Sequence, residues 1–240
     1  MTLKMVTMKN SDQLLSVLSV LKSNLDNNTF VIDGTTKMVE SLNVSMVLDP
    51  TDKIVKLNGR QTPLKYVEQE LKWYDSQDLS VDEIGKYAEL WLKICSIDNK
   101  INSNYGYLIY SNENHNQYKN ALLQLMRSKH SRRAIMIYNR PSMHTDSMKL
   151  GMSDFICTLA QHFFIRDNKL HSIVNMRSND AIYGFFNDFY WFATVQERFL
   201  QDVNKYYKEV KMGSLYYNAN SFHVYERHFN MLNLIFEKND

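Results

Sequence analysis

Cysteine is scarce in this chain, and its scarcity excludes one class of fold. Among 240 residues there are two cysteines, Cys95 and Cys157. Two thiols cannot build the disulfide framework that holds small secreted domains together. We therefore expect a reducing compartment, in which both cysteines remain free thiols.

Long apolar runs are missing as well. No segment approaches the roughly 18 apolar residues that a membrane-spanning helix needs. The N-terminal stretch MTLKMVTMKNSDQ also lacks the apolar centre of a signal peptide. These absences predict a cytoplasmic protein that does not attach to a membrane.

Charge of one sign is present only in small excess. Lysine and arginine number 28 against 26 aspartates and glutamates, which gives a formal net charge of +2. Such a balance creates no broad positive field that would attract nucleic acid. We therefore expect no direct binding to nucleic acid, and any basic site must be local.

What the chain does contain is material for a core. Hydrophobic residues make up 44% of it and aromatic residues 12%, enough at this length for a substantial buried interior. Internal repeats, low-complexity tracts and linkers are absent from the sequence. We expect residues 1–240 to form a single α+β domain.

Hydrophobic periodicity and turn signals predict alternating helices and strands. Residues 166–169 are expected to form the turn of a hairpin. Helices are expected at 11–25, 63–76, 81–97, 114–127 and 188–207 and near the C-terminus, and strands at 30–33, 38–48, 107–110, 134–138, 154–165, 170–176 and 213–225.

The stretch 151–188 groups several residues that could carry chemistry: a cysteine, an Arg-Ser pair and an Asn-Asp pair. A cysteine in a strand is often only a small buried hydrophobe. A nucleophilic role for Cys157 needs nearby cations that stabilise the thiolate, which Arg177 or the pair Arg132 and Arg133 could supply. Spacing alone leaves both interpretations open.

Five motifs in collinear order make the chain resemble the thymidylate synthase superfamily over roughly residues 30–235. Within the superfamily the likeness is greatest to the phage deoxycytidylate hydroxymethylases. The motifs are ELKWY at 70–74, NSNYG at 102–106, SRRAIMIYNRPSM at 131–143, RSND at 177–180 and HVY at 223–225.

The resemblance implies a fold and an activity. The fold is a six-stranded mixed sheet with helices on one side, and two subunits of a homodimer pack sheet against sheet. The activity is transfer of a one-carbon unit from 5,10-methylenetetrahydrofolate to carbon 5 of dCMP, followed by hydration to 5-hydroxymethyl-dCMP. A phage enzyme of this kind would act in the host cytoplasm and could join a phage nucleotide-synthesis complex.

By this resemblance Cys157 is the nucleophile. A thiolate that adds to carbon 6 of the pyrimidine turns the neighbouring carbon 5 into an enamine-like or enolate-like nucleophile. Carbon 5 then takes up the one-carbon unit that the folate carries. Tyr105 matches a tyrosine near this nucleophile.

The resemblance also assigns the phosphate ligands. Arg177 and Ser178 match ligands from the same subunit, while Arg132 and Arg133 match a pair that reaches across the dimer. Arginine suits a nucleotide monophosphate because its guanidinium can bond two oxygens at once. The alternative for Arg132 and Arg133 is a solvated strand end or a surface contact to nucleic acid.

Further matches lie around the sugar and the folate. His223 and Tyr225 match a pair that bonds the deoxyribose hydroxyl, and Asn179, in the RSND motif at 177–180, is a further substrate-binding residue. Asp180 matches an aspartate that contacts the pteridine, with Gly184 and Trp73 on the folate side. A metal site at His223 is not expected, because no carboxylate or cysteine completes a ligand set there.

Asp188 is the residue that we expect to select the base. Synthases that act on deoxyuridylate usually have asparagine there. Cytosine presents an amino donor and an unprotonated ring nitrogen, so a protonated carboxyl can accept from the first and donate to the second. As alternatives, Asp188 could cap a helix that begins at Phe189, or the neighbouring Asn187 could face the ring.

Glu70 matches a glutamate that organises water and proton transfers in this family. The alternative is a solvent-facing helix carboxylate, the commoner fate of glutamate. In a hydroxymethylase, water adds to the exocyclic methylene of the substrate, whereas in a synthase the folate delivers a hydride and becomes dihydrofolate.

Two departures from the family pattern bear on these expectations. Family members usually carry a basic residue after the aspartate that matches Asp33, but here Gly34 follows, and Lys37 could substitute as a phosphate ligand. The chain ends at Asp240, soon after its last expected helix, whereas synthases carry a longer C-terminal segment over the folate. This second difference favours hydration over hydride transfer.

Two alternative functions remain open from the sequence. One is a thymidylate synthase or a hydroxymethylase that acts on dUMP. The other is a non-catalytic nucleotide-binding scaffold that keeps the fold.

Overall fold

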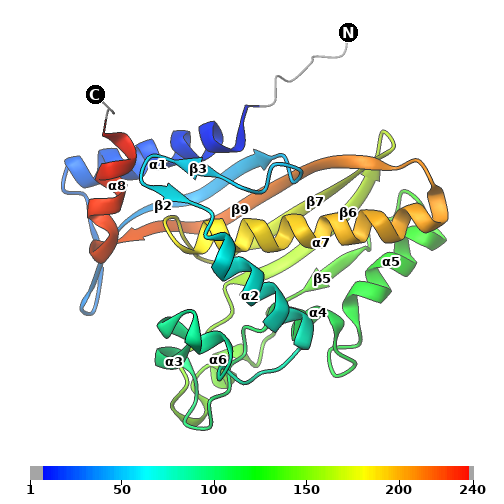
Figure 1. Ribbon diagram of the computed structural model, residues 1–240, viewed down its shortest axis with the longest axis horizontal. Coiled ribbons are helices and arrows are strands. Elements are labelled where there is room, and N and C mark those ends of the chain that lie inside the picture. The colour runs from blue at the N-terminus through cyan, green and yellow to red at the C-terminus, as the bar shows by residue number, and fades with distance from the viewer. Residues whose placement is uncertain (1–7, 238–240) are drawn as a thin grey trace.

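A mixed β-sheet forms the centre of the molecule in the computed structural model, which describes residues 8–237. Its strands lie in the order β1-β2-β9-β7-β6-β5, and the short β8 pairs with β9 (Figure 1). The strands are β1 (Val31–Asp33), β2 (Thr36–Leu48), β5 (Ile135–Ile137), β6 (Thr158–Arg166), β7 (Lys169–Met176), β8 (Asn179–Asp180) and β9 (Lys211–Tyr225). The predicted six-stranded mixed sheet is confirmed, with β8 as an addition.

The pairing of β7 with β9 is parallel, whereas the pairs β1–β2, β2–β9, β5–β6 and β6–β7 are antiparallel. A parallel pair needs a long crossover between its strands. The helix α7 (Gly184–Tyr207) provides it and runs along the sheet (Figure 1). The hairpin of β6 and β7 turns at Asp167 and Asn168, whose positive φ values of 48° and 56° are typical of a type I′ turn.

Helices surround one side of the sheet and its ends. A small two-stranded hairpin, β3 (Lys56–Leu57) and β4 (Arg60–Gln61), leads into α2. The remaining helices are α1 (Asn10–Asp26), α2 (Leu64–Ser76), η1 (Ile84–Lys86), α3 (Glu89–Ile94), α4 (Tyr105–Tyr110), α5 (Gln117–Arg127), α6 (Met143–Asp146), η2 (Lys149–Gly151), η3 (Glu226–His228) and α8 (Phe229–Phe236).

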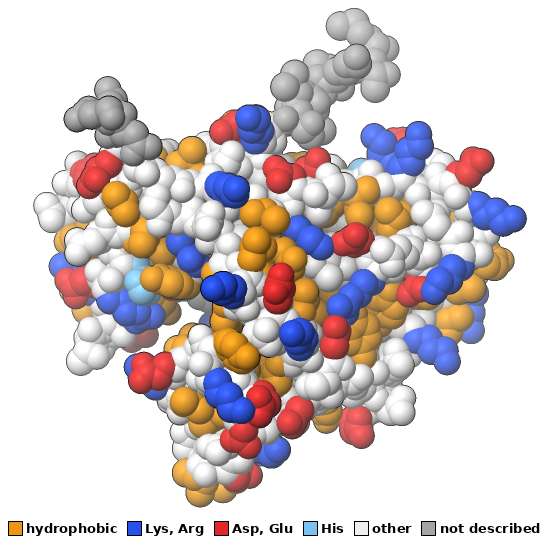
Figure 2. Space-filling model, viewed as in Figure 1, with side chains coloured by type: hydrophobic (Ala, Val, Ile, Leu, Met, Phe, Trp, Pro, Cys, Tyr) orange, Lys and Arg blue, Asp and Glu red, His pale blue; other side chains and the backbone are white. Residues whose placement is uncertain are grey.

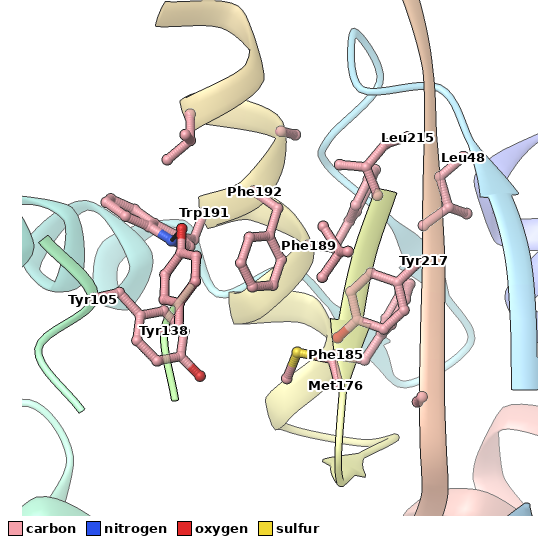
Figure 3. Packing of buried hydrophobic residues seen from close by; sticks show 14 of the residues in the cluster. Leu48, Tyr105, Tyr138, Met176, Phe185, Phe189, Trp191, Phe192, Leu215 and Tyr217 are labelled. Atoms are coloured by element: carbon pink, nitrogen blue, oxygen red, sulfur yellow. Dashed lines mark hydrogen bonds between the residues drawn. The ribbon is translucent and has the colours of Figure 1, made fainter. Parts of the chain in front are cut away.

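The core lies between α7 and the sheet. Along β7 every second residue is buried, because alternate side chains of a strand point to the same face. The aromatic residues of α7 meet this face, and Phe185, Phe192 and Trp191 are fully or almost fully buried there. Figure 3 shows these rings packed beside Tyr217 of β9 and Tyr105 of α4.

The opposite face of the sheet is open. Cross-strand pairing aligns one residue from each of five strands: Val47 pairs with Tyr216, Tyr216 with Ile173, Ile173 with His162 and His162 with Ile135. None of these five residues is fully buried. This row of apolar and aromatic side chains therefore lies on a face that helices leave uncovered.

Gly106 allows α2 and α4 to approach closely. A Cβ atom at this position would lie 1.7 Å from the carbonyl oxygen of Tyr74. Only glycine fits where two backbones come this near. The contact places α4, and with it Tyr105, against the helix that carries Glu70.

Three local predictions were wrong. Residues 107–110 belong to the helix α4 rather than to a strand, because the Asn104 side chain accepts a bond from the Tyr107 amide and caps that helix. Residues 81–97 are not one helix, because Ala88 has extended backbone and separates η1 from α3. Asp188 does not cap a helix that begins at Phe189, because α7 begins at Gly184.

Two of the sequence-based expectations concern the ends of the chain. The N-terminal stretch discussed for a signal peptide includes residues 1–7, and the C-terminal difference from synthases includes residues 238–240, so both lie partly outside the described residues.

Within residues 8–237, no helix is long and apolar enough to cross a membrane. Across the same range, no three His, Cys, Asp or Glu side chains gather as metal ligands.

Candidate active site

Cys157 lies immediately before β6, where the chain enters the sheet. Its carbonyl accepts a bond of 2.8 Å from the Arg177 amide, which joins it to the end of β7. The side chain keeps partial access to solvent although protein surrounds it on most sides. Burial raises the pKa of the Cys157 thiol to about 11, and Arg177 opposes this rise. The resting thiol is therefore protonated at neutral pH.

The guanidinium of Arg177 is bound to the backbone around the thiol. Its Nε donates to the carbonyl of Ile156 at 3.0 Å, and its Nη2 donates to the carbonyl of Phe155 at 2.6 Å and to Sγ of Cys157 at 3.5 Å. The ring of Phe155 lies beneath the guanidinium. Arg177 thus holds a cation beside Sγ, where it favours the thiolate.

The segment before Cys157 is anchored by a buried carboxylate. Asp154 accepts bonds from the backbone amides of Asn102 and Ser103 at 2.7 and 2.8 Å. Thr158, directly after the cysteine, donates to the hydroxyl of Tyr105 at 2.9 Å. The predicted proximity of Tyr105 to the cysteine thus has a direct structural basis, and the position of the thiol is fixed from both sides along the chain.

Asp188 lies on the second turn of α7 and points into the same region. Its Oδ2 accepts a bond of 2.7 Å from Nδ2 of Asn179, whose Oδ1 accepts one of 2.9 Å from the hydroxyl of Tyr217. Burial, and then the charge of Glu70, raise the pKa of Asp188 well above its usual range. The Asp188 charge in turn raises the pKa of the Cys157 thiol, which places the carboxyl near the thiol.

Glu70 is buried on the inner side of α2, so the solvent-facing alternative is wrong. Its Oε1 accepts a bond of 2.7 Å from the hydroxyl of Tyr66, and that hydroxyl accepts one of 2.9 Å from the indole of Trp91. Burial raises the pKa of Glu70 to about 7. Near neutral pH this carboxyl can therefore give up or take up a proton.

His223 is buried near the end of β9 between two carboxylate-bearing strands. Glu40 of β2 and Asp180 of β8 pair with it from either side. Burial lowers the pKa of His223, so the ring is neutral at pH 7. Its Nδ1 lies 3.4 Å from Oγ of Ser221, and its buried Nε2 has no hydrogen-bond partner within residues 8–237.

A cleft of about 730 Å³ opens beside these residues. Figure 2 shows a hollow between the region of α3 and the N-terminal end of α7. Two buried polar atoms on its wall, Nη2 of Arg60 and Oδ1 of Asn187, have no partner in the described part of the chain. The lining comprises Arg60, Pro63, Tyr66, Tyr87, Ala88, Glu89, Leu90, Lys93, Asp180, Tyr183, Asn187, Arg227 and His228.

The residues predicted to contact folate have different places around this cleft. Asp180 lines it, and its Oδ1 accepts bonds from the amides of Ile182 and Tyr183 at the entry to α7. Gly184 begins α7 beside Asn179. Trp73 does not line this cleft but borders a separate hollow, and its indole donates to the Ser80 carbonyl at 2.9 Å.

Several predicted ligands are not gathered with Cys157 in one chain. Arg132 and Arg133 are exposed before the edge strand β5 and border a separate hollow with Arg127. Lys37 forms an ion pair of 3.1 Å with Glu226. Among the other predicted ligands, Ser178 directly follows Arg177, and the ring of Tyr225 packs against that of His223 at 4.6 Å.

Sequence reasoning missed two contributors to the site. Tyr66 lies four residues before Glu70, a spacing that places both on one face of a helix and could have indicated their bond. The bond from Tyr217 to Asn179 joins β9 to β8 and has no comparable signal in the sequence. Asn187, offered as an alternative to Asp188, lines the cleft, while Asp188 bonds Asn179 and its charge acts on the Cys157 thiol.

Comparisons with known proteins agree with this architecture. A thermostable thymidylate synthase A from Bacillus subtilis has the same fold, with a TM-score of 0.74 at 21% identity, over 97% of this chain and 85% of that one. The fold is therefore that of thymidylate synthases. The family model for thymidylate synthase matches residues 18–240, and the chain belongs to this family.

Relatives within the family carry two different names. A deoxycytidylate 5-hydroxymethyltransferase of Enterobacteria phage T4 is 42% identical over 209 residues, which cover 85% of this chain and 83% of the phage protein. The protein of the same name from phage T6 gives the same identity and coverage. A thymidylate synthase of Bacillus mojavensis is 26% identical over 238 residues, which cover 92% and 81% of the two chains.

Proposed function

We propose that this protein is a deoxycytidylate 5-hydroxymethyltransferase that acts on dCMP with 5,10-methylenetetrahydrofolate. The observation that carries the proposal is the 42% identity to phage enzymes of that name, compared with 26% to a synthase. A half-buried aspartate, rather than an asparagine, whose charge acts on the Cys157 thiol agrees with a cytosine substrate.

Cys157 is the nucleophile of the proposed reaction. Its sulfur forms a bond to carbon 6 of the pyrimidine, and the electron pair of the 5,6 double bond becomes available at carbon 5. Because the thiol is protonated at rest, its proton must leave as the substrate binds. Arg177, 3.5 Å away, stabilises the sulfur anion at that moment.

Asp188 recognises the base. In its protonated form it accepts from the exocyclic amino group and donates to the ring nitrogen of cytosine. Burial, which raises the pKa of Asp188 well above its usual range, favours this form. Addition of sulfur at carbon 6 makes the ring nitrogen more basic, so the proton can move towards the ring as the adduct forms.

The folate, when bound, supplies an electrophilic one-carbon unit. The cleft fits such a ligand because it is roomy, partly aromatic and has the unpaired atoms of Arg60 and Asn187 on its wall. Asp180 and Asn187 would hold its ring system, and Tyr183 and Leu90 would cover it. Gly184 would contribute through the close packing of the α7 start, and Trp73 indirectly, by packing against Trp91, whose indole donates to the hydroxyl of Tyr66 in the cleft wall.

Glu70 manages water and protons. Carbon 5 loses its proton after it has gained the one-carbon unit, and the bond between that unit and the folate nitrogen breaks, so that tetrahydrofolate would leave. Water then adds to the exocyclic methylene of the nucleotide. With a pKa of about 7, Glu70 can accept a proton from that water. Elimination of sulfur from carbon 6 then restores the ring and the free Cys157 thiol.

The remaining polar residues hold the phosphate and the sugar. Arg177, Ser178 and Lys37 bind from the same subunit. His223, whose Nε2 is buried and unpaired within the described residues, binds the sugar hydroxyl with Tyr225. Asn179 contributes at the base through Asp188.

The site is completed by a second copy of the chain. Arg132 and Arg133 are exposed just before the edge strand β5 and line a hollow that does not include Arg177 or Ser178, so we assign them to the partner's site. The open face of the sheet, with Tyr216 and Ile173 at its centre, forms the dimer interface. Residues 1–240 act as one catalytic domain in the host cytoplasm, where the enzyme could join a phage nucleotide-synthesis complex.

Mass spectrometry of the nucleotide tests the proposal. The protein is incubated with methylenetetrahydrofolate and with dCMP or dUMP. We expect dCMP alone to gain the mass of formaldehyde, with no dihydrofolate formed. A gain on dUMP, or dihydrofolate as a product, would support a synthase instead, and no turnover of either nucleotide would support a non-catalytic scaffold.

A further inference from the structure

A hydrogen-bonded chain of three side chains lies behind the base-selecting carboxyl. The hydroxyl of Tyr217 donates to Oδ1 of Asn179 at 2.9 Å, and Nδ2 of Asn179 donates to Oδ2 of Asp188 at 2.7 Å. Tyr217 is fully buried and Asn179 is 3% exposed, so neither can exchange these bonds for water. In this arrangement the hydrogen bonds run from hydroxyl to amide to carboxyl.

Packing holds this chain in place. The ring of Tyr217 lies edge-on against Phe185 at 5.2 Å, and Figure 3 shows it projecting from β9 towards α7. Pairing of β8 with β9 fixes the backbone of Asn179 opposite Phe222. A Cβ at Gly184 would lie 3.0 Å from Nδ2 of Asn179 and 3.5 Å from Oδ2 of Asp188. Glycine at this position therefore leaves room for the bond between Asn179 and Asp188 at the start of α7.

An amide that donates to one carboxyl oxygen determines the place of the acid proton. The oxygen that accepts the bond from the amide N–H acts as the carbonyl oxygen of the acid, because a proton on that oxygen would point at the amide hydrogen. The proton of Asp188 therefore belongs on Oδ1. Rotation of the amide would reverse this assignment, and the Tyr217 hydroxyl would then have to accept the bond that it donates in this structure.

We propose that Asn179, oriented by Tyr217, is a positioning residue that places the acid proton of Asp188 on Oδ1 and so strengthens the choice of cytosine over uracil. The inference deepens the proposed function and rests on it. With the proton on Oδ1, that oxygen donates to the ring nitrogen of cytosine, and Oδ2 accepts from the amino group. Uracil needs the opposite arrangement, with an acceptor for its ring N–H and a donor for its carbonyl.

Binding measurements separate this role from folding. The Kd values of dCMP and dUMP are measured by calorimetry in a Cys157→Ser background, and the same background then carries Tyr217→Phe or Asn179→Ala. Because a mispaired buried polar group costs on the order of 1–3 kcal/mol, we expect the dUMP-to-dCMP ratio of Kd to fall about tenfold or more in each variant. Tyr138→Phe is the matched control, since its buried hydroxyl bonds the indole of Trp191 instead.

A variant that reverses the hydrogen bond between residue 179 and Asp188 gives a second test. Asn179→Asp replaces the donor by an acceptor, which moves the proton to Oδ2, so we expect the ratio to fall further than with alanine. A merely structural role would weaken both nucleotides alike and leave the ratio unchanged in all three variants, which would overturn the proposal. Failure of the proposed function is distinct: there, the wild-type protein would not hydroxymethylate dCMP. If the Cys157→Ser protein without further changes bound dCMP no more tightly than dUMP, both the proposed function and the role of Asn179 would be overturned.

Discussion

The guanidinium of Arg177 touches the thiol of Cys157, with Nη2 3.5 Å from Sγ. Arg177 lowers the pKa of this thiol, but burial has the larger effect and raises the pKa to about 11. One nearby cation therefore does not activate the nucleophile in the free protein. Under the proposed function, activation belongs to the complex with substrate.

Alkylation should reveal this protonated resting state. We expect iodoacetamide to react slowly with Cys157 at pH 7 and faster with each pH unit up to about 11, because only the thiolate reacts. Arg177→Leu removes the cation that lowers the pKa, so its reaction at any pH below 11 should be slower still. Peptide mass spectrometry measures the rate at Cys157. A rate that levels off below pH 8 would contradict the expectation.

Replacement of the nucleophile should separate the two cysteines. We expect Cys157→Ser to abolish release of tritium from carbon 5 of labelled dCMP, because no sulfur adds to carbon 6. Cys95→Ser is the matched control, since Cys95 is half-buried at the end of α3 and its thiol bonds the Leu92 carbonyl. Equal release from wild type and Cys157→Ser would exclude the covalent mechanism.

Glu70 should give the protein a pH-dependent stability. Burial raises its pKa from an ordinary 4.5 to about 7. Since the folded pKa is the higher one, the stabilising protonation is fully present below about pH 4.5 and lost as the pH rises through about 7. The expected loss is on the order of 3 kcal/mol in the free energy of unfolding. Glu70→Gln should remove it.

Urea denaturation at pH 5 and pH 8 measures this difference. The wild-type protein should lose more stability between the two pH values than Glu70→Gln does. The amide retains an acceptor for the Tyr66 hydroxyl, so the packing of α2 is preserved. Identical pH dependence in both proteins would assign the effect to other groups.

Asp188→Asn should change the preferred base. An asparagine offers a donor and an acceptor in the arrangement that uracil needs, and it cannot supply the acid proton for cytosine. We expect turnover of dCMP to fall by about two orders of magnitude or more and exchange at carbon 5 of dUMP to appear. Tritium release from each nucleotide measures both. Retained dCMP turnover would show that another residue selects the base.

Mixing two inactive variants tests the shared site. Cys157→Ser keeps its arginines, and Arg133→Ala keeps its cysteine, so a mixed dimer contains one complete site. Random exchange of subunits should restore about a quarter of wild-type activity. No recovery, with exchange verified by native mass spectrometry, would place Arg133 outside the partner's site.

Much of the sheet could be predicted from the sequence because its signals are local. The hairpin of β6 and β7 has alternating apolar residues on both sides of an Asp-Asn turn, and both turn residues adopt positive φ as expected. The long α7 also follows from its aromatic periodicity, although its first turn was missed. Glycine at 184 and asparagine at 187 carry little helical propensity, and packing against the sheet overrides it.

Features that depend on tertiary contacts could not be predicted. Tyr107–Tyr110 is apolar enough for a strand, and only the Asn104 cap and the approach of Gly106 to α2 make it helical. The resemblance named Glu70 and Asp188, but their burial and raised pKa values follow from neighbours that lie far away along the chain. Asn179 was expected at the substrate, whereas in the structure its amide bonds Asp188 and Tyr217.

The pairing of β2 with β9 must form late in folding. Ser45 and Asn218, which bond across this pair, are 173 residues apart in the chain. Such distant contacts must overcome a large loop-closure entropy, so topologies rich in them fold slowly. During synthesis β2 is made long before β9, so the edge of β2 that pairs with β9 stays unpaired until then. An unpaired strand edge promotes aggregation. We therefore expect a strong dependence of the soluble yield on chaperones and on temperature.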